Sequence, residues 1–138
     1  MNYTELTNAI KEYTDNTETT FVNNIPNFVR QTEERIYRSI LIPELRKNVT
    51  TSVTSSNRFL AKPTDFLAVF SIAVVDGSSN YSFLLPKDVN FIREAYPATA
   101  TTGLPVYYSL FDGDNFLIAP TPDSGYTVQL HYYYDPPS

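Results

Sequence analysis

The sequence predicts an α+β fold in which two N-terminal helices pack with an antiparallel β-sheet or sandwich of about five or six strands. Apolar residues recur at helical spacing over the first 47 residues, and short β-branched and aromatic runs separated by turn residues follow. One short helical segment is inserted among those runs. The chain has 138 residues, of which 42% are hydrophobic, and this suits one domain. We expect a single domain over residues 1–138, with 1–47 helical and 48–138 mainly β.

The two helices are predicted from caps and periodicity. Thr4 is the expected N-cap of the first helix, and residues 15–20 read as a loop. The second helix is expected to begin near Asn24, with Pro26 in its first turn, and to end before Pro43. Its apolar stripe consists of Ile25, Phe28, Val29, Thr32, Ile36 and Ile40. Such a stripe must be covered, either by the sheet or by neighbouring subunits.

The rest of the second helix is charged. Arg30 with Glu34, and Glu34 with Arg38, have the i,i+4 spacing of weak ion pairs. Arg35 and Tyr37 lie among them, and contact with nucleic acid is one interpretation of this basic and aromatic stretch. Because Glu33 and Glu34 offset most of the positive charge, a protein-facing or solvated helix surface is the favoured interpretation.

The second part of the chain alternates strands and turns. Residues 67–75 are almost continuously apolar, which predicts a central strand buried on both faces. The turn cluster at 76–80 then predicts a hairpin with 81–85. In the last strand, Val128, Leu130, Tyr132 and Tyr134 should share one side. The remaining elements are expected as strands over 48–56, 59–60, 106–111, 116–119 and 126–134, and as a short helix after 86–88.

No set of residues points to an enzyme or to a cofactor. His131 is the only histidine and there is no cysteine, so a zinc site is not predicted and His131 has no evident catalytic partner. The stretch from Asp112 to Asn115 resembles the start of a calcium loop but lacks the later ligands, and a hairpin turn explains it better. We therefore expect no catalytic residue, no metal and no cofactor.

Charge and composition exclude other classes. The net charge of −5 does not suit a reader of nucleic acid sequence, which needs a basic patch. No apolar run approaches a membrane span, and no signal peptide is visible, so we expect no membrane contact and synthesis in the cytosol.

Tyrosine is the more informative signal. Tyr107 and Tyr133 lie in Tyr-rich runs that place rings on both faces of their strands. One interpretation is that the outer face packs on another subunit, and the other is an ordinary core with half-buried rims. The candidate interface residues are thus Arg30, Glu34, Arg35, Tyr37, Arg38, Tyr107 and Tyr133.

Several short motifs together resemble the head-to-tail adaptor, or connector, proteins of short-tailed double-stranded DNA phages. They are residues 21–28, 31–38 and 41–46, then Pro63 to Phe66, residues 103–108, residues 119–122 and residues 132–136, in the family's order.

This resemblance implies a non-enzymatic structural protein of the virion tail or neck. Such adaptors form a ring, usually of twelve copies, between the portal protein and the tail nozzle or tail tube, and DNA passes through the channel without sequence readout. Family members usually continue into further helices after the last strand. Because this sequence ends at Ser138, we expect a neighbour to cover its helix stripe. The alternatives are an aromatic-rich β module that binds carbohydrate or another tail or fibre component, and a small hydrolase.

Overall fold

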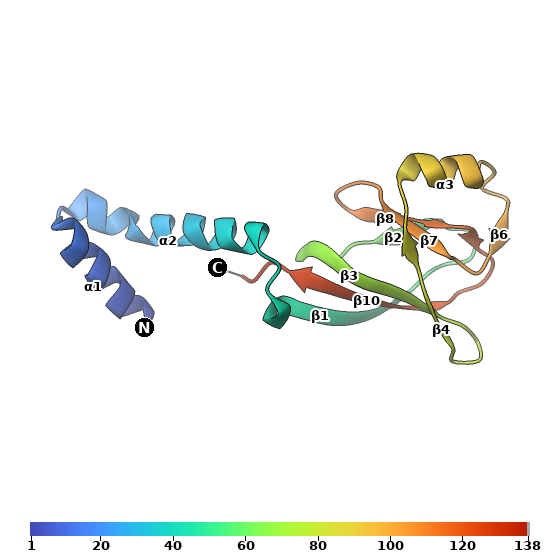
Figure 1. The fold of residues 1–138 in the computed structure, drawn as a ribbon, viewed down its shortest axis with the longest axis horizontal. Helices are drawn as coiled ribbons and strands as arrows, with labels where there is room; N and C mark the ends of the chain where they lie inside the picture. The colour runs from blue at the N-terminus through green and yellow to red at the C-terminus, as the bar shows by residue number, and fades with distance from the viewer. Residues whose placement is uncertain (138) are drawn as a thin grey trace. The chain divides into compact units, whose positions relative to one another are not determined.

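The computed structural model describes residues 1–137, which form two compact units divided after Ile40. We call residues 1–40 the helical unit and residues 41–137 the β unit. Two helices occupy the first, and strands in mainly antiparallel sheets together with a short inserted helix occupy the second (Figure 1). The predicted α+β class is therefore confirmed.

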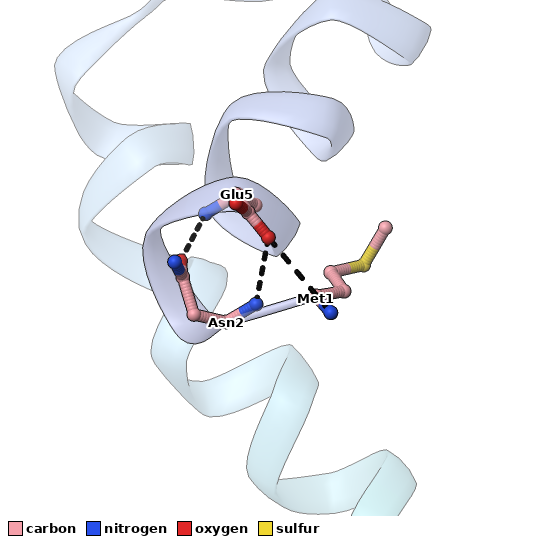
Figure 2. Close-up of polar contacts among 3 residues, drawn as sticks. All are labelled: Met1, Asn2 and Glu5. Carbon is pink, nitrogen blue, oxygen red and sulfur yellow. Dashed lines mark hydrogen bonds and ion pairs between the residues drawn. The ribbon is translucent and has the colours of Figure 1, made fainter.

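The first helix begins with a capping box. Helix α1 spans Tyr3–Thr14, and its N-cap is Asn2 rather than the predicted Thr4. The backbone N–H of Glu5 donates to Asn2 Oδ1 at 2.9 Å, and the N–H of Asn2 donates to Glu5 Oε2 at 2.9 Å (Figure 2). The Met1 ammonium lies 3.8 Å from the same carboxylate. Asn2 prevails because this arrangement satisfies two backbone donors reciprocally.

Helix α2 spans Thr19–Ser39, so it begins earlier than the predicted Asn24. Pro26 lies inside the helix and removes one backbone hydrogen bond. Packing holds the helix together around it, because Ile25 is 0% exposed and the rings of Phe21 and Phe28 are 6.1 Å apart. The helix ends before Pro43, as predicted, and Ile40 already has extended backbone angles.

The β unit contains two four-stranded sheets. Sheet A has the strand order β1-β10-β3-β4, and sheet B has the order β2-β8-β7-β5. A third, two-stranded sheet pairs β6 with β9 in parallel. The elements are η1 Pro43–Leu45, β1 Arg46–Ser52, β2 Phe59–Ala61, β3 Phe66–Val75, β4 Tyr81–Phe83, β5 Leu85–Pro86, α3 Val89–Ala95, β6 Thr102–Gly103, β7 Tyr107–Leu110, β8 Asn115–Ala119, β9 Thr121–Pro122 and β10 Thr127–Tyr134.

The main core lies between sheets A and B. Ile72, Leu130 and Tyr132 from sheet A meet Phe116 and Ile118 from sheet B in one buried cluster. The predicted inner side of β10 is confirmed, because Val128, Leu130 and Tyr132 are buried and Tyr134 packs against the same cluster. The outer face of sheet B is covered by α3, whose Ile92 packs on Leu117 and Ala119 (Figure 1).

Three strand predictions need correction. The region 67–75 is not buried on both faces, because Phe70 lies on the outer face of sheet A and is 51% exposed. The predicted single strand over 81–85 divides into β4 and β5, which belong to different sheets. Strands β6 and β9 lie outside all the predicted strands, since a two-residue parallel pair leaves no periodic pattern in the sequence.

The capping box gives a test of the N-terminal boundary. Asn2→Ala removes the acceptor for the Glu5 N–H and is expected to cost about 1 kcal/mol of local helix stability. Hydrogen exchange of the first-turn amides of α1 should then accelerate about fivefold, which corresponds to that free energy. Thr4→Ala is the matched control and should leave exchange nearly unchanged. Equal effects of the two substitutions would contradict the assignment of Asn2 as the cap.

Candidate interaction surfaces

The charged residues of α2 lie on one side of the helix. At 100° per residue, Arg30, Glu34, Tyr37 and Arg38 fall opposite the apolar stripe, and Arg35 lies near its border. Arg30 Nε donates to Glu34 Oε1 at 3.3 Å, as the spacing predicts. Both side chains are well exposed, so this pair contributes only about 0.3–0.5 kcal/mol. Within the helical unit, the charged side of α2 is therefore uncovered and can face solvent or another protein.

The apolar side of the helical unit forms an open groove. Its volume is about 330 Å³, and its apolar lining comes from α1 and α2: Leu6, Ile10, Phe28, Val29 and Ile36. Ile25 is the only residue in these two helices that is fully buried, and Ile36 remains 43% exposed. The stripe predicted from the sequence is thus present, but most of it is uncovered within this unit.

The two predicted tyrosines lie in different environments. Tyr107 is half-buried beneath α3, where its ring centroid is 5.5 Å from that of Phe91 and 6.3 Å from that of Tyr96. Tyr133 lies on the outer face of sheet A, opposite the buried Tyr132 side of β10. Only Tyr133 is therefore on a sheet face that has no helix over it in the β unit.

The outer face of sheet A carries an aromatic cluster around Phe70. The Phe70 ring centroid is 5.0 Å from that of His131 and 6.3 Å from that of Tyr133. The Arg46 guanidinium lies over the same ring at 4.7 Å from its centroid, in cation–π geometry. Neither Arg46 nor Phe70 is predicted as a surface residue from the sequence. Phe70 lies within an apolar run, and a bulge in the β3–β10 pairing turns it outward, where it meets Arg46.

A small hollow lies beside this cluster. Its volume is about 170 Å³, and it is lined by residues of all four strands of sheet A: Asn48, Ser71, Ala73, Tyr81, Phe83, Gln129 and His131. The Gln129 amide nitrogen donates to the Tyr81 hydroxyl at 3.2 Å across it. This volume is below the roughly 300–1,000 Å³ of sites that enclose small ligands. The face therefore has the character of a flat contact surface rather than a ligand pocket.

A polar network anchors the inner face of sheet A. Asp65 accepts a hydrogen bond from the Tyr132 hydroxyl at 2.7 Å and another from Lys47 Nζ at 2.7 Å. Burial, together with the Asp65 carboxylate, raises the pKa of Tyr132 to about 12. Burial alone would raise the pKa of Asp65, but the bonds from Lys47 and Tyr132 outweigh it and lower that pKa. The network stabilises the core edge and offers no free acid or base.

Asp112, at the start of the stretch that resembles a calcium loop, has a structural role. The Asp112 carboxylate accepts from the backbone N–H of Asp114 at 2.9 Å and of Asn115 at 2.7 Å, so it closes the β7–β8 turn. These bonds lower the pKa of Asp112.

Within residues 1–137, no group of three or more His, Asp or Glu side chains is placed to hold a metal ion. None of the helices in that range has the length and apolar character that crossing a bilayer requires.

The Tyr132 network predicts a response to alkaline pH. A tyrosine whose folded pKa is raised stabilises the fold below its ordinary pKa of about 10, and this stability is lost as pH rises through about 12. Tyr132→Phe should cost about 1.5–3 kcal/mol at pH 7 by removing a hydrogen bond to a charged group. It should also reduce the loss of stability between pH 10 and 12, measured by urea unfolding. Part of that loss should remain in the variant, because partial burial also raises the pKa of Tyr108.

Tyr133→Phe is the control, because its ring lies on the outer face. If it changed the pH dependence as much as Tyr132→Phe, the network would not be the cause.

Comparison with known proteins gives a family match over the sequence. The model of the SU10 adaptor protein family matches residues 1–138, so it covers both the helical unit and the β unit. A comparison with curated proteins finds no match. The family match confirms the resemblance to phage head-to-tail adaptors, and it supports a structural role at the virion neck rather than a catalytic one. The chain therefore belongs to the SU10 adaptor protein family.

Proposed function

We propose that this protein forms a ring of twelve copies that joins the portal protein to the tail nozzle of a short-tailed phage. The observation that carries this proposal is the uncovered apolar groove of the helical unit. Two helices that bury a single side chain completely have too little core to be stable alone, so they need a surface to pack against. Membership of an adaptor family supports neighbouring subunits and the portal as that surface.

The other exposed faces give the ring its remaining contacts. The charged side of α2, with Arg30, Glu34, Arg35, Tyr37 and Arg38, suits a polar contact with a partner whose charge is complementary. Tyr133 and the Phe70 cluster suit a contact on the β unit, because aromatic and arginine side chains are enriched at interfaces. Tyr107 is half-buried beneath α3, so its contribution is restricted to the exposed part of its ring.

The acidic charge suits passage of DNA without sequence readout. With a net charge of −5, the subunit lacks the excess of basic residues that holds phosphates tightly. A channel built from such subunits exerts little attraction on the genome as it moves through. We infer that DNA is a transient occupant rather than a bound ligand.

The groove gives a mutational test. Ile36→Asp places a charge on a side chain that is 43% exposed in the single chain, so the subunit should still fold and its β unit should melt at nearly the same temperature. In the assembled ring this charge would be buried without a partner, at a cost of several kcal/mol. Assembly with portal, measured by mass photometry, should fall at least a hundredfold in apparent affinity. Thr32→Asp replaces a groove side chain that is already polar, so it should have a smaller effect.

If Ile36→Asp instead unfolded the isolated subunit, the chain itself would cover the groove. The proposal that other subunits or the portal cover it would then be wrong.

Direct imaging tests the ring. Negative-stain or cryo-electron microscopy of the full chain mixed with portal should show closed rings on the portal, with twelve subunits expected. A chain that stays monomeric and binds neither portal nor nozzle would overturn the proposal.

Carbohydrate binding by the aromatic face is the alternative function, but the hollow of about 170 Å³ is small for a sugar site. Selective, tight binding on a glycan array would favour that alternative.

A further inference from the structure

The β unit contains a second groove, at the free edge of β3. Its volume is about 610 Å³, which is within the range of sites that hold short peptides or small ligands. One wall is formed by four consecutive residues of β3, from Phe66 to Val69, and the other by Tyr108, Ser109 and Leu110 of β7. Pro86, Lys87 and Asp88 close one side. Alternate side chains of a strand point to opposite faces, so a wall of consecutive residues is a strand edge.

This edge lacks a neighbouring strand. On the β4 side, β3 pairs only through Ala73, Val74 and Val75, and the last backbone bond there runs from the Leu84 N–H to the Ile72 carbonyl at 2.9 Å. Among residues 1–137, no backbone hydrogen bond from that side reaches residues 67–71. The opposite wall is similar, because β5 pairs with β7 only at Tyr107 and Tyr108. The groove therefore presents unpaired backbone donors and acceptors between apolar walls.

An unpaired edge of this kind accepts an extended peptide as an added strand. The chain itself carries a segment of the required type between α2 and η1. Ile40 has φ −129° and ψ 126°, and Ile42 has φ −84° and ψ 121°, so both are extended. Ile40 and Leu41 are 58% and 51% exposed, and residues 40–42 belong to no strand. Pro43 restricts Ile42 to extended backbone, and both isoleucines favour a strand.

We propose that residues 40–42 of one copy insert into the β3-edge groove of a second copy as an added strand. A three-residue strand is in scale with this fold, since β5, β6 and β9 have two residues each. The charges are also complementary: Arg38 and Glu44 flank the segment, and Lys87 and Asp88 lie at the groove. Because segment and groove are different surfaces, the contact is head-to-tail, which is the type that closes into rings. The inference rests on the proposed ring.

The absence of cysteine from the sequence permits a clean cross-linking test. Ala68→Cys is placed in the groove wall, and a second protein carries Ile40→Cys, Leu41→Cys or Ile42→Cys. Under mild oxidation with portal present, a disulfide between the two variants should form with period-two alternation. Position 41 alone, or positions 40 and 42 together, should react at least tenfold faster than the rest, because alternate residues face opposite sides. Thr50→Cys, exposed on β1, replaces Ala68→Cys as the control and should give no such pattern.

The same samples separate this inference from the proposed function. If mass photometry detects rings but cross-linking to position 68 is absent or equal at all three positions, the added strand is wrong and the ring stands. If no oligomer forms with portal, both fail. As a second measurement, Leu41→Asp should raise the assembly midpoint at least tenfold without changing the melting of the subunit, whereas Val106→Asp, at another exposed position, should not. Unchanged assembly of Leu41→Asp would also overturn the proposal.

Discussion

Strand β10 is the element on which the rest of the β unit depends. It lies between β1 and β3, so sheet A exists only when this last strand is in place. Its inner side chains, Val128, Leu130 and Tyr132, fill the centre of the core against sheet B. Just after β10, the Asp135 N–H donates to the Asp65 carbonyl at 2.8 Å, next to the carboxylate that binds Tyr132. Strand pairing, core packing and the polar contacts with Asp65 thus all depend on β10 and the residue that follows it.

The two sheets differ in what covers them, and this difference suits an adaptor. Sheet B is covered on its outer face by α3, whereas the outer face of sheet A shows Phe70 and Phe83, the latter 64% exposed. The helical unit adds an apolar groove of its own. A chain of 138 residues can bury only part of its apolar surface. In an adaptor protein, this exposed apolar surface is available for contact with other proteins.

Much of the fold was readable from local patterns. The alternation from Val128 to Tyr134 gave the correct inner face, because one side of β10 meets a core and the other does not. The predicted start of α2 near Asn24 was wrong. The cap signal of Asn24 and the position of Pro26 were overridden by packing around Ile25. Short parallel pairs such as β6–β9 depend on contacts between residues distant in sequence, and no local signal reveals them.

The candidate surfaces were less predictable than the elements. Charge spacing correctly paired Arg30 with Glu34, but placing Tyr107 beneath α3 required knowledge of the tertiary fold. Phe70 was hidden within an apolar run, and a bulge decides which face it occupies. Spacing along the chain reports which residues share a side of an element; it does not report what lies over that side. The free edge of β3 is likewise a property of sheet order alone.

The small core of the helical unit has a thermodynamic consequence for any contact that its helices make. Two helices that bury one side chain completely gain little packing energy to offset the conformational entropy that is lost when they are ordered. The free energy of any contact made by such helices includes the cost of ordering them. A rigid partner surface should therefore bind them more tightly than a second helical unit that has to be ordered as well.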